Sequence, residues 1–236
     1  MQLKNAVVLV TGGNRGLGKA FVEEALARGA RTVYAAARDP RSVTTPGATP
    51  IALDVTDPDA VKRTAADAQD VTLVVNNAGV MRYQSLLHGD LDEVRREFET
   101  NFYGPVLITR AFAPILPANG GGRFLNVNSV TSWFSRGLSY NATKAALWQA
   151  TNGFRQELAA QGTRVTSLHV GFIDTDMAAS IDAPKSDARE VARIALDGVE
   201  ADADEVLADD LARTIKQGLA GDIYLRPLPP PGRVEG

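Results

Sequence analysis

A tyrosine and a lysine stand four residues apart in the stretch SYNATKAAL, so Tyr140 and Lys144 share one face of a predicted helix. A phenol has an ordinary pKa of about 10, which is too high for acid–base work at neutral pH. A nearby ammonium favours the phenolate and lowers that pKa. Ser129 ends the preceding run GRFLNVNS and could hydrogen-bond the same substrate oxygen. In the alternative interpretation Tyr140 packs in the interior and Lys144 reaches solvent, and the pair alone does not exclude it.

The composition narrows the classes of function. The 236 residues carry a formal net charge of −3, which argues against nucleic acid as the main partner. There are no cysteines and only two histidines, so disulfides, thiolate chemistry and a histidine-rich metal site are not expected. No apolar run approaches the roughly 20 residues that cross a bilayer, and the first residues lack the pattern of a signal peptide. We therefore expect a cytoplasmic protein with no metal, no membrane and no nucleic-acid partner.

Short apolar runs alternate with longer amphipathic runs along the chain. The apolar runs predict strands, and they fall at residues 6–13, 31–38, 50–55, 71–79, 122–129 and 163–171. The amphipathic runs predict helices at residues 17–29, 57–68, 91–116, 139–161 and 186–201, and residues 204–221 close the fold. Strands that are apolar on both sides and separated by helices indicate a parallel sheet that is covered on both faces.

The predicted fold is therefore α/β, a doubly wound Rossmann-type three-layer sandwich with a parallel sheet of about seven strands. We assign residues 1–225 to a single dinucleotide-binding catalytic domain. Residues 226–236 form a proline-rich tail, which we expect to be extended or disordered because proline has no backbone donor. Ligands of such folds bind at the carboxyl ends of the strands, which is where the candidate residues fall.

The stretch TGGNRGLG follows the first predicted strand and opens the first helix. Its glycines allow a pyrophosphate to approach the backbone N–H groups at the helix N-terminus. In the alternative interpretation they only form a tight turn. The cofactor residues predicted from this stretch are Gly12, Asn14, Arg15, Gly16, Leu17 and Gly18.

The end of the second strand distinguishes NADP from NAD. Ala37 stands where an NAD-binding fold normally carries an acid for the ribose hydroxyls, and Arg38 follows it. Arg38 and Arg15 could together clamp a 2′-phosphate, although both could equally be solvated loop residues. Asp39 lies beyond Arg38 and is not expected to act as the ribose acid. We expect NADP(H) as the cofactor.

Five features occur in order: TGxxxGxG, NNAG at residues 76–79, Asn101, Ser129 and YxxxK. In this order the chain resembles the short-chain dehydrogenase/reductase (SDR) family, in its compact single-domain branch and of the NADP-preferring type, up to about residue 225. The combination is specific, although each motif alone is not.

The resemblance implies a role for each matching residue. Tyr140 would be the general acid in reduction, Lys144 would hold the nicotinamide ribose, and Ser129 would polarise the carbonyl. Asn101 would anchor a water that relays protons through Lys144, and Asn76 would pack against the cofactor. Further cofactor contacts would come from Asp54, Val55, Asn77, Ala78, Gly79, Gly171, Ile173 and Thr175.

Two departures from the family pattern concern the substrate side. Val170 replaces the usual proline before Gly171, which could loosen the loop under the nicotinamide. The segment from Ser129 to Tyr140 is about two residues shorter than usual and should approach the substrate differently. Ser132 is a weaker candidate for the catalytic serine, because it lies beyond the strand end.

The expected substrate pocket is mostly apolar, and its residues are Val80, Met81, Trp133, Phe134, Phe172 and Met177. This lining predicts a carbonyl reductase that interconverts a hydrophobic ketone or aldehyde and its alcohol by direct hydride transfer. Arg82 and Arg136 could meet an acidic substrate or lie in solvent. The alternatives are a 3-oxoacyl thioester reductase and a non-catalytic NADP-binding sensor. The resemblance implies a homodimer or homotetramer, formed through the helices after Asn101 and from Tyr140.

Overall fold

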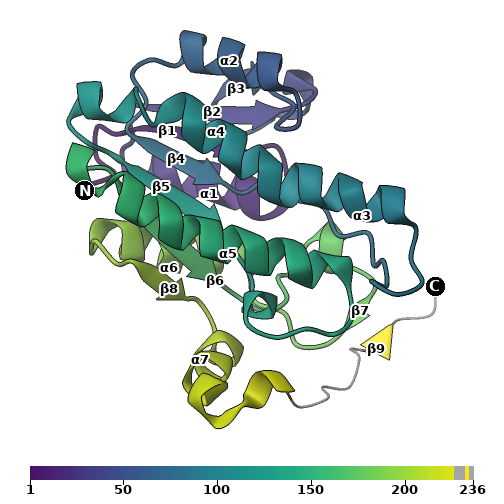
Figure 1. Ribbon diagram of the computed structural model, residues 1–236. Coiled ribbons are helices and arrows are strands. Elements are labelled where there is room, and N and C mark those ends of the chain that lie inside the picture. The colour runs from purple at the N-terminus through teal and green to yellow at the C-terminus, as the bar shows by residue number, and fades with distance from the viewer. Residues whose placement is uncertain (226–231, 234–236) are drawn as a thin grey trace.

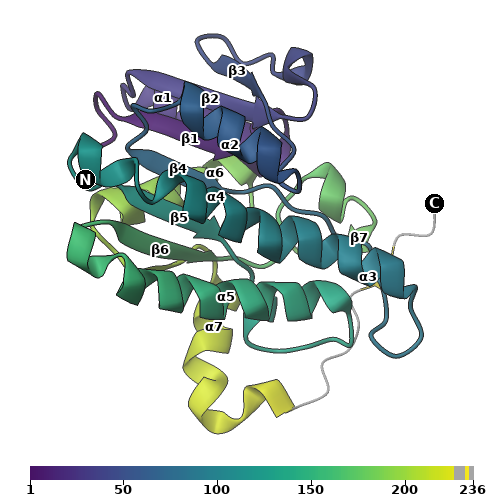
Figure 2. The ribbon, with the colours of Figure 1, turned by 45° about the horizontal axis from the view of Figure 1, so that its top comes forward.

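Seven parallel strands form one sheet in the computed structural model, which describes residues 1–225 and 232–233. Their order is β3-β2-β1-β4-β5-β6-β8 (Figures 1 and 2). The strands are β1 (Val7–Thr11), β2 (Thr32–Ala37), β3 (Thr49–Ala52), β4 (Leu73–Asn76), β5 (Arg123–Val127), β6 (Arg164–His169) and β8 (Glu205–Leu207). The predicted doubly wound parallel sheet is confirmed.

Helices cover both faces of the sheet, as its apolar strands require. They are α1 (Gly16–Ala27), α2 (Pro58–Asp67), α3 (Leu91–Phe98), α4 (Gly104–Phe112), α5 (Ser139–Glu157), α6 (Ala188–Glu200) and α7 (Asp210–Gly218). One apolar core lies under α1 and α6, where Phe21 and Leu196 are buried. The other lies under α2, α4 and α5, where Phe112 and Phe124 are buried. The sheet therefore separates two cores.

Aspartates begin four of these helices. Asp57, Asp90, Asp187 and Asp209 each accept a hydrogen bond from a backbone N–H in the first turn of α2, α3, α6 and α7, respectively. Such caps satisfy donors that a helix N-terminus otherwise leaves free. By contrast, no described side chain caps α1 or α5. These two helices carry the glycine turn and Tyr140.

The helix predicted over residues 91–116 is divided. A π-helical turn at Glu99–Tyr103 joins α3 to α4, and α4 ends at Phe112. Asn101 lies in this turn and is fully buried. A π turn adds one residue to a helical turn and is often found at functional sites. The sequence periodicity gave no sign of it.

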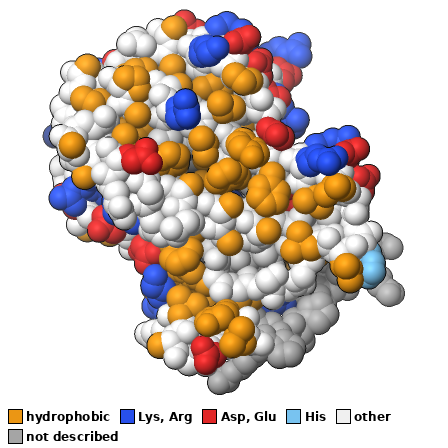
Figure 3. Space-filling view, viewed as in Figure 1, with side chains coloured by type: hydrophobic (Ala, Val, Ile, Leu, Met, Phe, Trp, Pro, Cys, Tyr) orange, Lys and Arg blue, Asp and Glu red, His pale blue; other side chains and the backbone are white. Residues whose placement is uncertain are grey.

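Apolar side chains gather over the face on which α3, α4 and α5 run (Figure 3). Leu91 and Tyr103 are among the exposed large hydrophobic residues of the chain.

None of the described helices is both long and apolar enough to cross a membrane.

The tail differs from the prediction at two residues. Gly232–Arg233 form a short strand, β9, that pairs antiparallel with β7 (Ile181–Asp182). These two residues follow the prolines and have their backbone N–H groups, so they can pair. The remaining tail residues, 226–231 and 234–236, lie outside the described residues.

The β1–α1 turn depends on glycines for space. Gly12 has a φ of +67°, and a Cβ added to Gly18 would lie 2.0 Å from the carbonyl oxygen of Gly12. That contact involves backbone, so the turn itself would have to shift. Gly153 lies inside α5, and a Cβ added there would meet nothing within 4 Å.

We expect Gly18→Ala to lower the free energy of unfolding by about 1–3 kcal/mol, because the turn must move to admit the methyl group. Gly153→Ala should raise it by about 0.5–1 kcal/mol, because alanine loses less conformational entropy in a helix. Denaturant unfolding of both variants tests this. Equal effects of the two substitutions would contradict it.

Candidate active site

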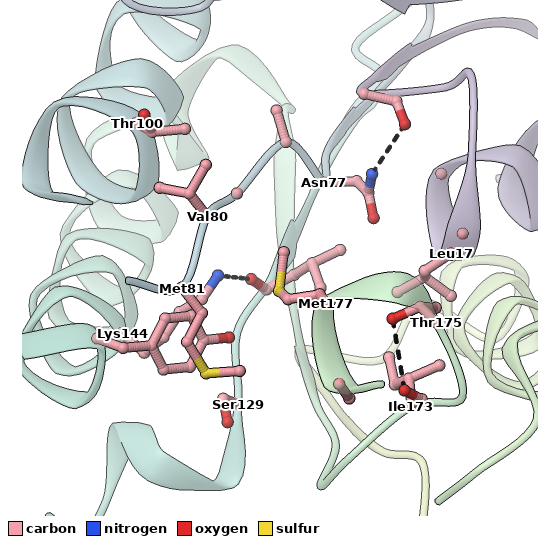
Figure 4. Close-up of a pocket in the computed structure, with 18 of the residues that line it drawn as sticks. Leu17, Asn77, Val80, Met81, Thr100, Ser129, Lys144, Ile173, Thr175 and Met177 are labelled. Atoms are coloured by element: carbon pink, nitrogen blue, oxygen red, sulfur yellow. Dashed lines mark hydrogen bonds between the residues drawn. The ribbon is translucent and has the colours of Figure 1, made fainter. Parts of the chain in front are cut away.

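A cavity of about 920 Å³ opens along the carboxyl ends of the strands, from the β1–α1 turn to α7. Figure 4 shows Leu17, Ile173 and Thr175 on one side of it, and Met81, Ser129 and Lys144 on the other. The predicted cofactor residues line this cavity with the exception of Asn76, and they come from segments up to 163 residues apart in the chain (Gly12 to Thr175). The topology therefore brings together the glycine turn and the Tyr140 helix.

Polar contacts fix the glycine turn against β4. The Thr11 hydroxyl accepts hydrogen bonds from the N–H groups of Asn77 and Ala78, both at 3.0 Å. The Asn77 amide donates to the Thr11 carbonyl at 2.9 Å. Asn77 lines the cavity, but Asn76 does not. The expectation that Asn76 packs against the cofactor is wrong: its amide lies within the sheet and donates to Asn126 Oδ1 at 2.8 Å.

The turn offers donors and space for an anion. No described side chain caps the first N–H groups of α1, and the first turn of this helix contains no acidic residue. The glycines leave room where a Cβ would collide with backbone. Arg15 and Arg38 line the same end of the cavity and are exposed. The residues present therefore fit a dinucleotide phosphate.

Asp39 is occupied by its own neighbour. Its two carboxylate oxygens accept hydrogen bonds from the Arg41 side chain at 2.9 and 3.0 Å, and the pKa of Asp39 is lowered by that guanidinium. Ser42 lies beside it, accepting a hydrogen bond from the Asn14 amide at 3.0 Å. Ser42 lines the cavity and was not among the predicted residues. The end of β2 thus presents an arginine and a hydroxyl, with its carboxylate already paired.

Ser129 is held so that its hydroxyl hydrogen remains available. Its Oγ accepts hydrogen bonds from the N–H of Thr131 at 3.2 Å and from the Thr131 hydroxyl at 3.0 Å. Ser129 lines the cavity, so its own hydrogen can point to a substrate oxygen. Ser132 does not line the cavity; its Oγ is buried and faces the backbone N–H of Ser129 at 3.5 Å. The geometry favours Ser129 over Ser132 as the serine that meets the substrate.

Lys144 is buried on the floor of the cavity. Its Nζ donates to the carbonyl of Val127, at the end of β5, at 2.8 Å and lies 5.6 Å from the centre of the Tyr140 ring. Burial lowers the pKa of Lys144 to about 8, because a low-polarity surrounding disfavours the ammonium. The lysine still carries its charge at neutral pH.

The pKa of Tyr140 is raised, not lowered as the sequence suggested. Burial of the phenol is the main cause, and the carboxylate of Glu97 and the hydroxyl of Tyr83 add to it. Glu97 is fully buried and contacts the hydroxyl of Ser139, the residue before Tyr140. All of these effects favour the protonated phenol. Tyr140 therefore holds its proton, as a general acid must.

The side chain of Asn101 makes its hydrogen bonds to other protein groups. Its Oδ1 accepts from the N–H of Val80, and its Nδ2 donates to the carbonyl of Val80, both at 2.8 Å. The same amide donates to the Thr143 hydroxyl at 3.1 Å. Asn101 does not line the cavity. Asn101 therefore connects the segment that follows β4 to α5, the helix that carries Tyr140 and Lys144.

Five of the six predicted substrate residues line the cavity: Val80, Met81, Phe134, Phe172 and Met177. Trp133 does not. Its ring is stacked on His169, with the ring centres 4.0 Å apart, and belongs to a small core under α7. The prediction for Trp133 is wrong because its ring packs against the buried His169 and not against the cavity.

The loop after β6 is anchored, despite Val170 in place of proline. Asp209 accepts a hydrogen bond from the N–H of Gly171 at 2.7 Å and caps α7 through the N–H of Ala212. Ser186 donates to the same carboxylate at 3.3 Å. The expected loosening is therefore not seen. Asp209 and Leu211, which also lines the cavity, were missed because nothing in the sequence links α7 to this loop.

Tyr83 lines the cavity and connects two of its loops. Its hydroxyl donates to the carbonyl of Met177 at 3.2 Å, so it joins the loop after β4 to the loop after β6. Its φ of +56° is unusual for a residue with a side chain. No motif in the sequence predicts this contact.

The chain matches the family model described as short chain dehydrogenase over residues 6–186. Among curated proteins, it is 31% identical to the 3-oxoacyl-[acyl-carrier-protein] reductase FabG of Vibrio cholerae, over 75% of this chain and 77% of that protein. It is also 31% identical to the sorbitol dehydrogenase of Cereibacter sphaeroides, over 82% and 80%. The names of these two relatives refer to different substrates.

A solved structure is more similar still. The chain is 39% identical to a short chain dehydrogenase from Burkholderia cenocepacia in complex with NADP, over 98% of this chain and 100% of that one, with a TM-score of 0.93. The family motifs, the cavity that gathers them and these matches lead to one conclusion. This protein belongs to the short-chain dehydrogenase/reductase family and is an oxidoreductase.

Proposed function

We propose that the protein is an NADPH-dependent carbonyl reductase, which interconverts a hydrophobic ketone or aldehyde and its alcohol with Tyr140 as the proton donor. One observation carries this proposal: Ser129, Tyr140 and Lys144 line a single cavity with the glycine turn. A protonated phenol, a free serine hydrogen and a buried ammonium are the groups that a carbonyl oxygen needs as it gains charge.

The chain's own residues supply position and protons. A bound nicotinamide cofactor would supply the hydride. The glycine turn, Arg15 and Arg38 would hold its phosphates. Ser129 would donate a hydrogen bond to the carbonyl oxygen, and Tyr140 would transfer its proton to that oxygen. Lys144, charged at neutral pH, would stabilise the phenolate that remains.

The preference for NADP rests on the end of β2. Arg38 is exposed beside the cavity, and the neighbouring carboxylate of Asp39 is paired with Arg41. A 2′-phosphate would find a cation there, whereas the ribose hydroxyls of NAD would lack their usual acid. The Burkholderia relative with NADP supports this assignment.

The apolar lining favours a hydrophobic carbonyl compound. Met81, Phe134, Phe172 and Met177 offer little hydrogen bonding to a sugar. The similarity to FabG keeps a 3-oxoacyl thioester as a second candidate. A panel of aryl ketones, aldehydes and acyl thioesters, followed by cofactor absorbance, separates the two. Tight cofactor binding with no turnover would instead favour a non-catalytic NADP-binding sensor.

The exposed apolar face over α4 and α5 supports a homo-oligomer, either a dimer or a tetramer. Sedimentation of the purified chain, compared with a Tyr103→Asp variant, tests this. A monomer at micromolar concentration would contradict the proposal.

Tyr140→Phe should lower kcat by about 10²–10⁴-fold, because the variant loses the transferred proton but keeps the ring. NADPH binding, followed by quenching of protein fluorescence, should change little. Tyr34→Phe serves as the control and should keep most of the activity, because the Tyr34 hydroxyl meets Asp70 and Tyr34 does not line the cavity. Undiminished turnover in Tyr140→Phe would rule out the mechanism.

Arg38→Ala should weaken NADPH binding by roughly 10- to 100-fold, because one charge-assisted contact to the 2′-phosphate is lost. NADH binding should stay the same. Arg31→Ala is a matched control, since Arg31 is an exposed arginine at the other end of β2. Equal losses for NADH and NADPH would contradict the proposed role.

Lys144→Met should abolish turnover yet stabilise the cofactor-free protein. Lowering the lysine pKa from 10.5 to about 8 is equivalent to about 3 kcal/mol of lost stability at neutral pH. Part of the gain is offset by the lost hydrogen bond to Val127, so we expect the Tm to rise by about 5 °C.

The sign of the pH dependence provides a second check. Between about pH 8 and pH 10.5 the unfolded chain binds more protons at this lysine than the folded chain does. The free energy of unfolding of the wild-type protein therefore rises with pH in this window. The stability difference between the wild type and Lys144→Met becomes smaller as a result. Calorimetry at several pH values measures this, with Lys19→Met on the surface as the control. A lower Tm for Lys144→Met at pH 7 would contradict the prediction.

A further inference from the structure

His169 ends β6 and has no part in the mechanism above. Its side chain is fully buried, and it does not line the cavity. Yet its Nδ1 lies 3.1 Å from the carbonyl oxygen of Ser129, and its Nε2 lies 2.8 Å from the hydroxyl of Ser167. Both nitrogens of this buried imidazole therefore have hydrogen-bond partners, and one partner is the main chain of Ser129. We asked what this contact does for the reaction.

The partners fix which nitrogen carries the proton. A carbonyl oxygen can only accept, so Nδ1 must donate to Ser129. In a neutral ring Nε2 then accepts, and the hydroxyl of Ser167 must donate to it. Ser167 in turn accepts from the amide of Asn128 at 2.8 Å. Each donor in this chain of contacts meets an acceptor.

The surroundings keep the ring neutral and in place. Burial lowers the pKa of His169 to about 4. Glu205, 3.9 Å from Nε2, would favour the charged ring, but it is paired with Lys216 at 2.6 Å. Trp133 stacks on the imidazole at an interplanar angle of 17°. The ring therefore has little freedom to turn.

Ser129 is consequently held from three directions. Its carbonyl accepts from His169, and also from the N–H of Ser132 at 3.0 Å. Its N–H faces the hydroxyl of Ser132, and its own Oγ accepts from Thr131. Among the contacts of the described residues, the hydroxyl hydrogen of Ser129 is the one left for a substrate. His169 is the one side chain of this set that comes from another strand.

We propose that His169 is a positioning residue of the reaction: its Nδ1–H fixes the main chain of Ser129, and so aims the serine hydroxyl at the substrate oxygen. Trp133 supports this role by clamping the imidazole. The inference rests on the proposed function, since it requires Ser129 to meet the substrate. It assigns a purpose to the buried histidine and to the tryptophan beside it.

Two nearly isosteric substitutions separate the contacts. In His169→Asn, the amide nitrogen can take the place of Nδ1 and donate to Ser129. In His169→Gln, the amide reaches the place of Nε2 and leaves the Ser129 carbonyl without that donor. We expect kcat to fall roughly 10- to 100-fold in His169→Gln, with KM for NADPH unchanged, and only a few-fold in His169→Asn.

A double-mutant cycle shows whether the effect passes through the serine. Adding His169→Gln to Ser129→Ala should cost almost nothing further, because the hydroxyl to be positioned is gone. An equal loss in the Asn and Gln variants, or full additivity with Ser129→Ala, would overturn the inference. If Ser129→Ala alone kept full activity, the proposed function itself would fail.

One measurement needs no change at His169. The chain has only two histidines, so nitrogen NMR of the His88→Gln variant reports His169 alone. We expect the neutral Nδ1–H form at pH 7. Finding the Nε2–H form would overturn the inference even if the His169 variants did not fold.

Discussion

Helices cover both faces of the sheet, so polar functional side chains can lie only where its strands end. The position of the whole site depends on this constraint. The strands run parallel, so their carboxyl ends all reach one edge. The glycine turn follows β1, Arg38 follows β2, and Ser129 follows β5. One edge therefore gathers every group that the proposed reaction uses.

The same burial sets the charges of the site. It holds the ammonium of Lys144 at a pKa of about 8 and raises the pKa of Tyr140. A sequence motif suggests an activated tyrosine, but burial favours a protonated one. The carboxylate of Glu97 acts in the same direction. Such an arrangement suits a proton donor, and it leaves the final adjustment to the charge of the bound cofactor.

Asp209 and α7, near the end of the described chain, stabilise the site through residues outside the cavity motifs. Asp209 anchors the loop at Gly171, and Lys216 lies 4.9 Å from the ring centre of Trp133, which covers His169. Through these contacts α7 and its capping residue Asp209 hold both the loop after β6 and the segment after Ser129. Neither contact belongs to a motif, so the site extends well beyond the residues that a pattern identifies.

The sequence by itself determined the alternation of strands and helices, the parallel sheet and the residues of the phosphate loop. It could do so because apolar periodicity and glycine spacing are local properties. Only the tertiary structure decided that Trp133 turns inward while Phe134 lines the cavity, and that Asn77 rather than Asn76 faces it. These outcomes depend on partners, such as His169 for Trp133 and Asn126 for Asn76, that lie on other strands. The pKa of Tyr140 was likewise beyond the sequence, because it depends on burial and on Glu97, 43 residues away.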